Sequence, residues 1–178
     1  MENQEQMNPR QQRLLNDYND MADLKDQSKG MLDFSVTNNY QQYDLAIDGI
    51  ETLVGANRGT IRKRHRFIIE LPPEYPLQQP TIRFKETIFH PNWYSDGRVC
   101  FGTQWVPGDK LSELVIDIIK MMTFEIVNPR SPANSTANDW YLQNAGRIKN
   151  VVPKIQFPPP SEEESLEFYD VGDLEFYD

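Results

Sequence analysis

The N-terminal part of the chain carries apolar residues at the spacing of a helix. From Gln11 to about Asp26 they recur every three or four positions, which is typical of an amphipathic helix with one buried face. Pro9 stands where such a helix can begin, and Gly30 ends the segment. The apolar positions are Leu14, Leu15, Tyr18, Met21, Ala22 and Leu24.

Four runs after this helix are typical of strands, because they are rich in branched residues or alternate between apolar and polar positions. They are Met31–Thr37, Tyr43–Val54, Arg64–Leu71 and Thr81–Lys85. Turn-forming residues separate the first three runs, and a proline-rich loop precedes the fourth. The pattern predicts an antiparallel meander of four strands.

The rest of the chain begins with a long irregular segment and ends in two helices. Residues 86–109 show little periodicity and many turn-forming residues, and ordered loops of this length are often functional. An apolar stripe over Leu111–Met122 predicts a helix that ends before Pro129, and Asn134–Arg147 predicts a last helix. Strands followed by helices indicate the α+β class.

Length and composition narrow the class of protein. The chain has 178 residues, of which 38% are hydrophobic, so it suffices for one compact domain with some additional residues. No apolar run is long enough to span a bilayer, and the N-terminal residues lack the apolar stretch of a secretory signal. A single cysteine, Cys100, excludes an internal disulfide framework, and a reducing, cytoplasmic setting is expected.

The formal net charge of -9 is unevenly distributed. Eight of the 27 acidic residues lie in 158–178, which contains no Lys or Arg, so residues 1–157 hold 19 acids and 18 bases. The acidity therefore belongs to a tail, and bulk charge gives no support for nucleic-acid binding. We expect a flexible N-terminus at 1–8, a domain at 9–157 and a proline-led acidic tail at 158–178.

The tail contains the sequence LEFYD twice, at 166–170 and 174–178. Three consecutive prolines before it favour an extended spacer. The repeated aromatic and acidic residues fit a docking peptide for a partner, and they equally fit a solvated tail whose aromatic side chains pack on the domain. Both interpretations remain open at this stage.

Cys100 is the strongest candidate nucleophile, because a thiol is partly ionised near neutral pH. A lone cysteine is more often a buried structural residue. Cys100, however, lies in the irregular segment between Gly97 and Gly102 and outside any apolar stripe. This placement favours a chemical role.

Two polar residues precede the cysteine within the same segment. His90 would complete a Cys–His pair for acyl transfer, but a histidine followed by Pro91 in a turn is often structural. The side-chain amide of Asn92 fits a donor to a developing oxyanion, or alternatively a residue that only shapes the turn. A metal site made of Cys100, His90 and His65 would lack a fourth ligand and the usual spacing.

Taken together, these segments resemble the core of the ubiquitin-conjugating enzymes. The family signature is a His-Pro-Asn triplet ten residues before a cysteine, which here is His90-Pro91-Asn92 and Cys100. The matching segments are PPEYPLQQP (with Tyr75, Pro76 and Pro80), Trp105-Val106-Pro107, and Asn128-Pro129 with Pro132. The resemblance covers about residues 9–150 and also implies the fold, with an N-terminal helix, a four-stranded meander, an active-site segment and two C-terminal helices.

The resemblance implies a reaction. Cys100 would accept the C-terminal acyl group of ubiquitin or a ubiquitin-like protein from an activating enzyme, hold it as a thioester and pass it to a substrate lysine. Asn92 would stabilise the oxyanion or order the nearby loop, and His90 would be structural. No cofactor or metal is needed, since the activating enzyme spends the ATP.

The resemblance also implies a surface for partners. In the family, the activating enzyme and ligases bind the first helix and two loops near the active-site segment. In this chain the corresponding residues are Arg13 in the first helix, Leu77 in one loop, and Trp105 and Pro107 in the other. The activating enzyme and a ligase would therefore be expected to contact these residues, and a target protein is a further expected partner.

Several departures from the family indicate a divergent member. Ile126 stands where many members carry an acid that helps to deprotonate the incoming lysine, so Asp96 or a partner residue would have to replace it. Leu77 replaces a frequent aromatic contact. The short segment between Cys100 and Trp105 is similar to the corresponding segment in conjugating enzymes of bacterial ubiquitin-like pathways.

Two other functions remain to be weighed. A non-catalytic variant that serves as a binding adaptor would explain the missing acid, but such variants usually lack the cysteine. A thiol hydrolase that uses Cys100 and His90 would need an acid to orient the histidine, and the constraint of Pro91 also argues against it.

Overall fold

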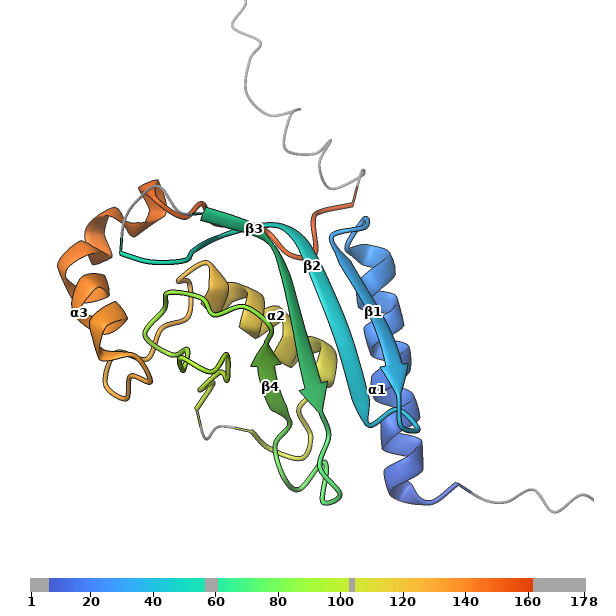
Figure 1. Cartoon of the computed structure of the whole chain (residues 1–178). Coiled ribbons are helices and arrows are strands. Elements are labelled where there is room, and N and C mark those ends of the chain that lie inside the picture. Colours follow the sequence, from blue (N-terminus) through green and yellow to red (C-terminus); the bar gives the residue numbers. More distant parts are fainter. Residues whose placement is uncertain (1–6, 57–60, 103–104, 162–178) are drawn as a thin grey trace, which may run out of the picture.

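The computed structural model describes residues 7–56, 61–102 and 105–161 of the chain (Figure 1). Its elements follow the order helix, four strands, two helices and a short 3-10 helix. They are α1 (Pro9–Gln27), β1 (Leu32–Thr37), β2 (Gln42–Leu53), β3 (Ile61–Glu70), β4 (Thr81–Phe84), α2 (Leu111–Met122), α3 (Ser135–Asn144) and η1 (Ala145–Asn150). The predicted N-terminal segment 1–8 and both LEFYD repeats lie wholly or largely outside the described residues.

The four strands form one antiparallel sheet in the order β1-β2-β3-β4. This topology confirms the predicted meander. Side chains on β2 alternate as the sequence pattern requires: Tyr43, Leu45 and Ile47 are buried, and their neighbours face outward. The pairing of β2 with β3 shifts register between Asp48 and Thr52, so β2 bends there.

The long N-terminal helix begins with a well-formed cap. The Asn8 side chain accepts a hydrogen bond from the Gln11 backbone N–H, and the Gln11 side chain accepts one from the Asn8 N–H, while Pro9 occupies the first helical position. Leu14, Met21 and other residues of one face are buried. In Figure 1, α1 lies beside β1, and α3 lies at the opposite end of the molecule.

The core forms two adjoining clusters. The larger one fills the space between the inner face of the sheet, α1 and α2, and it includes Tyr43, Phe67 and Ile118. A smaller cluster around Phe124 supports α3 and includes Leu53 and Val152. Among the described residues, no helix is long and apolar enough to cross a membrane.

The segment 151–161 packs on the domain after η1. Val152 and Phe157 are buried, and Phe157 belongs to the larger cluster. Lys29 donates a hydrogen bond from Nζ to the Pro160 carbonyl at 2.7 Å, and the three prolines are half-buried. Pro158–Pro160 therefore lie against the end of α1, although the sequence favours a free spacer there.

Candidate active site

The irregular segment between β4 and α2 contains a small hairpin that carries the cysteine. Trp93 and Val99 form an isolated antiparallel bridge, and the Tyr94 N–H donates to the Arg98 carbonyl at 2.9 Å. Gly97 turns the chain with φ +86°, where a Cβ would lie 2.2 Å from the Phe84 carbonyl oxygen. Only glycine fits this close approach, which docks the hairpin on the end of β4.

Cys100 lies at the end of this hairpin and is half-buried. Its backbone N–H donates to the Asn92 carbonyl at 2.8 Å, which returns the chain to the residue eight positions earlier. The cysteine is thus outside both core clusters and next to the asparagine that the sequence singled out. This position is compatible with a reactive thiol and differs from that of a buried structural cysteine.

The Asn92 side chain is fully buried and joins two loops. Its Oδ1 accepts from the Asn128 N–H at 2.9 Å, and its Nδ2 donates to the carbonyls of Asn128 at 3.1 Å and Ser131 at 3.5 Å. The amide is therefore already engaged with the turn at 128–131. These contacts favour a role in ordering the loop beside Cys100.

His90 is fully buried among aromatic rings. Its ring centroid lies 5.0 Å from that of Trp93 and 4.6 Å from that of Phe124, and its Nδ1 accepts from the Asn92 N–H at 3.0 Å. Burial lowers the pKa of His90 to about 3, although a backbone contact with Ile126 opposes this shift. A neutral histidine of such low basicity is a poor general base, which argues against a thiol hydrolase.

Two acids that could replace the missing carboxylate, Glu125 and Asp96, already have partners. Glu125 accepts a hydrogen bond from the Thr123 hydroxyl at 3.0 Å and lies 3.6 Å from Lys154 Nζ. Asp96 accepts from both the backbone N–H and the guanidinium of Arg98, and these bonds lower the pKa of Asp96. Both carboxylates therefore have partners, and neither is free to act as a base.

An open groove of about 350 Å³ begins at the residue after Cys100 and runs along α2. Its lining combines apolar and charged side chains, namely Phe101, Trp105, Asp109, Lys110, Glu113, Leu114, Asp117, Met121 and Ile126. Ile126 is 39% exposed, so an apolar side chain faces solvent at the position where the resemblance implies an acid. Sequence reasoning missed Glu113 and Asp117, although helical periodicity alone places this i, i+4 pair on the polar face of α2.

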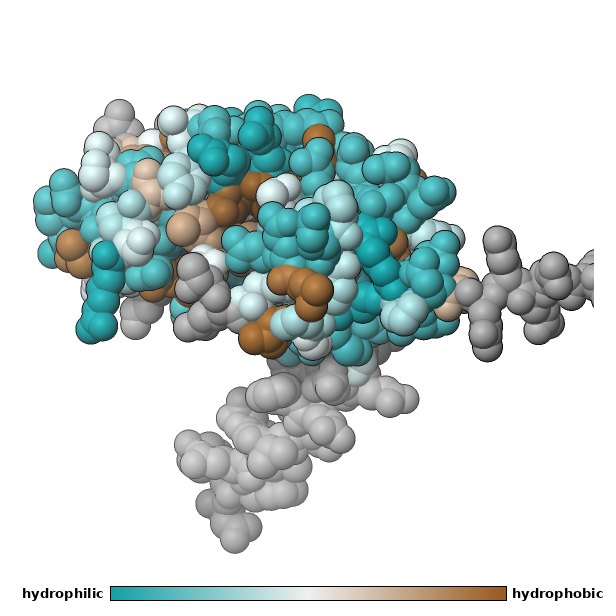
Figure 2. Space-filling view, turned by 90° about the horizontal axis from the view of Figure 1, so that it is seen from below, coloured by the Kyte–Doolittle hydropathy of each residue, from teal (hydrophilic) through white to brown (hydrophobic). Residues whose placement is uncertain are grey.

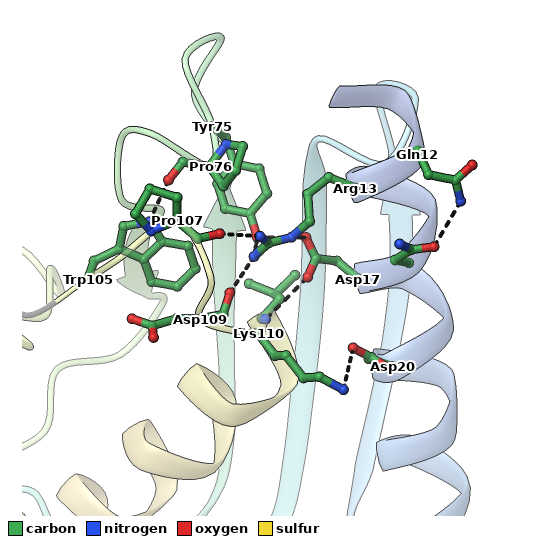
Figure 3. A network of polar contacts seen from close by, with 12 residues as sticks. Gln12, Arg13, Asp17, Asp20, Tyr75, Pro76, Trp105, Pro107, Asp109 and Lys110 are labelled. Carbon is green, nitrogen blue, oxygen red and sulfur yellow. Dashed lines mark hydrogen bonds and ion pairs between the residues drawn. The ribbon is translucent and has the colours of Figure 1, made fainter. Parts of the chain in front are cut away.

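The two loops with the predicted partner residues lie side by side (Figure 3). Trp105 donates from its indole N–H to the Pro76 carbonyl at 2.8 Å, and its ring packs at 5.7 Å from that of Tyr75. Leu77 is 79% exposed and Val106 is 53% exposed. The space-filling view from below shows a few apolar patches among mostly hydrophilic side chains (Figure 2).

Arg13 contacts the chain itself and is only partly exposed. Its Nε lies 2.8 Å from Asp17 Oδ2, and its two terminal nitrogens donate to the Tyr75 hydroxyl and to the carbonyls of Pro107 and Asp109 (Figure 3). The structure therefore brings Arg13, Trp105 and Pro107 together, with Leu77 on the neighbouring loop. Cys100, Asn92 and His90 form a separate group at the base of the hairpin.

A metal centre has no support among the residues described. Within 7–56, 61–102 and 105–161, no three His, Cys, Asp or Glu side chains lie close enough to hold a metal ion. His65 instead lies buried on β3, where its Nε2 is 2.8 Å from the Ile50 carbonyl oxygen.

Comparison with known proteins points to one family. The profile of the ubiquitin-conjugating enzymes matches residues 13–155. A solved Plasmodium yoelii chain named as a ubiquitin conjugating enzyme is 21% identical, with a TM-score of 0.56 over 78% of this chain and 90% of that one. At this identity the likeness establishes the shared fold.

Curated relatives resemble a shorter part of the chain. Ubiquitin-conjugating enzyme E2 1 of Caenorhabditis elegans is 33% identical over 90 residues, which are 49% of this chain and 46% of that protein. The African swine fever virus ubiquitin-conjugating enzyme E2 is 33% identical over 41% of this chain and 38% of its own length. The Triticum aestivum ubiquitin-conjugating enzyme E2 7 is 35% identical over 41% of this chain and 52% of its own length. The matches thus span about half the length of these relatives or less.

Proposed function

Because the chain belongs to the ubiquitin-conjugating enzyme family, we propose that Cys100 carries ubiquitin or a ubiquitin-like protein as a thioester and transfers it to a substrate lysine. The observation that carries this proposal is the place of Cys100. The cysteine is half-buried, lies outside the core and is held by a backbone hydrogen bond next to Asn92. A reducing compartment, which we propose to be the cytoplasm, keeps such a thiol available.

The transfer takes place in two exchanges at one carbonyl carbon. In the first, the Cys100 thiolate attacks the activated C-terminal acyl group of the modifier, a C–S bond forms, and the group that held the acyl on the activating enzyme leaves. In the second, the substrate amine attacks the thioester, a C–N bond forms, the amine loses a proton, and Cys100 leaves as a thiolate. No cofactor takes part in either exchange.

Asn92 and His90 support this chemistry by ordering the backbone next to Cys100. The contacts of Asn92 with Asn128 and Ser131 fix the loop that faces the hairpin, so we assign Asn92 the ordering role, with oxyanion stabilisation as the alternative. His90 supports the backbone of Asn92 through Nδ1 and takes no proton near neutral pH. The deprotonating group for the amine comes, in this proposal, from the substrate or a partner, because Glu125 and Asp96 are engaged.

The partner surface proposed for the activating enzyme, a ligase or a target protein is formed by the two adjacent loops and α1. Leu77 and Val106 are exposed apolar side chains on these loops, and Pro107 lies beside them. Arg13 serves this surface by holding the Pro107 and Asp109 carbonyls. The acidic tail is proposed as a separate docking peptide.

A thiol-sensitive adduct tests the proposed function. Wild-type protein incubated with ubiquitin, its activating enzyme and ATP should form a covalent adduct that disappears on adding a thiol, and Cys100→Ala should form none. Cys100→Lys should instead trap an adduct that survives thiol, because an amide replaces the thioester. The same assay is repeated with ubiquitin-like proteins and their own activating enzymes.

The second candidate function is a binding adaptor, which the exposed Ile126 and the engaged acids favour. An adaptor would bind the modifier without forming the adduct. Equal binding by wild type and Cys100→Ala, with no thiol-sensitive adduct from either protein for any modifier, would establish the adaptor and reject the enzyme.

A further inference from the structure

A buried carboxylate joins three separate parts of the fold at the partner-facing end. Asp17 of α1 is 1% exposed. Its Oδ2 accepts from Arg13 Nε at 2.8 Å and from the Tyr75 hydroxyl at 2.6 Å, and its Oδ1 lies 3.4 Å from the Leu111 N–H at the start of α2 (Figure 3). We call Arg13, Asp17 and Tyr75 the Asp17 cluster.

The cluster places a negative charge where α2 needs one. The N-cap residue of α2 is Lys110, whose side chain makes no capping hydrogen bond. The first N–H groups of a helix lack partners and carry partial positive charge, so the Asp17 carboxylate supplies from α1 the interaction that Lys110 does not. Asp17 therefore links the position of α2 to that of α1.

The same cluster holds both partner-facing loops. Arg13, oriented by Asp17, donates to the carbonyls of Pro107 and Asp109, and the Tyr75 hydroxyl anchors the other loop just before Leu77. Burial and the neighbouring Asp17 carboxylate raise the pKa of Tyr75, so its hydroxyl keeps the proton that it donates. A residue with almost no exposed surface thus determines how two exposed loops lie relative to each other.

We propose that Asp17 is a positioning residue for partner recognition: its buried carboxylate sets the spacing of the Leu77 loop, the Val106 loop and the start of α2. The inference rests on the proposed function for its kinetic consequence. Replacing the carboxylate by an amide leaves Arg13 without its counter-charge and frees both loops. Partners that bind across the two loops then bind more weakly, while the chemistry at Cys100, on another part of the fold, proceeds at its usual rate.

The test compares Asp17→Asn with Asp20→Asn. Asp20 lies on the same helix, and its carboxylate pairs at 3.2 Å with the side chain of Lys110, the N-cap residue of α2, outside the Asp17 cluster. In steady-state loading, Asp17→Asn should raise the KM for the activating enzyme charged with modifier by about fivefold or more, with kcat within about twofold of wild type. Discharge from Cys100 to free lysine should be unchanged in both variants, and Asp17→Glu should recover part of the loading defect.

A spectroscopic measurement tests the cluster without activity. The indole N–H resonance of Trp105, which reports its hydrogen bond to Pro76, should shift in Asp17→Asn and stay in place in Asp20→Asn. Tyr75→Phe, which removes one hydroxyl, provides the same comparison if Asp17→Asn does not fold.

An unchanged Trp105 resonance in the folded variants, or a loss in kcat with KM unchanged, would overturn the inference. A wild type that forms no thioester would instead reject the proposed function, and the Trp105 resonance would then decide the positioning role.

Discussion

Three consecutive residues next to the cysteine each bond to a different stretch of backbone. His90 accepts from the Asn92 N–H, the Pro91 carbonyl accepts from the N–H groups of Ala133 and Asn134, and the Asn92 side chain bonds to the turn that begins at Asn128. Proline suits the middle position because it has no N–H that would need a partner. At the scale of single residues, the triplet is thus a support for Cys100.

The buried His90 makes stability depend on pH. The pKa of His90 is about 3 in the folded chain, against about 6.5 when unfolded, so below pH 6.5 only the unfolded chain takes up this proton. The free energy of unfolding should therefore fall as the pH falls toward 3, with His90 contributing about 1.4 kcal/mol per unit. His90→Gln removes this contribution, so urea denaturation at pH 7.5, 6 and 4.5 should show the wild type losing more stability than the variant.

The second buried histidine, His65, does not disturb this comparison. It is also buried, and burial lowers its pKa as well, but it is present in both proteins and its contribution cancels in the difference. A stability difference between wild type and His90→Gln that stays constant over this pH range would mean that His90 titrates alike in the folded and unfolded chains.

At the scale of elements, hydrophobic periodicity predicted the regular helices and strands. The first helix, the meander and α2 follow directly from spacings of 3.6 and 2. The prediction for β3 began at Arg64, whereas the strand begins at Ile61, because the charged residues at its start carry no apolar alternation. The last predicted helix ends as α3 at Asn144 and continues as the 3-10 helix η1, a change in winding that no apolar spacing signals.

The segment 151–161 contributes to the core although it contains no helix or strand. Phe157 is 9% exposed and packs in the larger cluster, so Phe157→Ala should lower the free energy of unfolding by about 3 kcal/mol. The exposed neighbour Gln156 is the control, and Gln156→Ala should change stability by less than about 0.5 kcal/mol. If chemical denaturation shows equal effects for the two variants, the segment does not pack as described.

At the scale of the whole molecule, the sequence singled out candidate site residues but could not predict how the fold brings them together. The spacing of His90 and Cys100 is local and could be recognised in the chain. The convergence of Arg13 with Asp109, 96 positions apart, depends on how α1 packs beside α2, and no local pattern contains that information. The family resemblance places Arg13 on the partner surface, and only the structure adds that its guanidinium also bonds to Asp17, Tyr75 and two loop carbonyls.

The distribution of charge over the whole chain leads to a prediction for the acidic tail. Ending the chain after Ser161 removes all eight tail acids but keeps the three prolines that pack on the domain, so the free energy of unfolding should stay unchanged. If the LEFYD repeats dock, calorimetric titration should show that the shortened chain binds one partner more weakly, tested with the activating enzyme and the modifier.

A matched full-length variant in which Phe168, Tyr169, Phe176 and Tyr177 are replaced by Ala keeps every acid. Equal loss in both proteins means that the aromatic residues bind, since charge alone would leave the alanine variant at wild-type affinity and make binding strongly salt-dependent. Unchanged affinity of both proteins for every partner would show that the tail is only a solvated acidic segment.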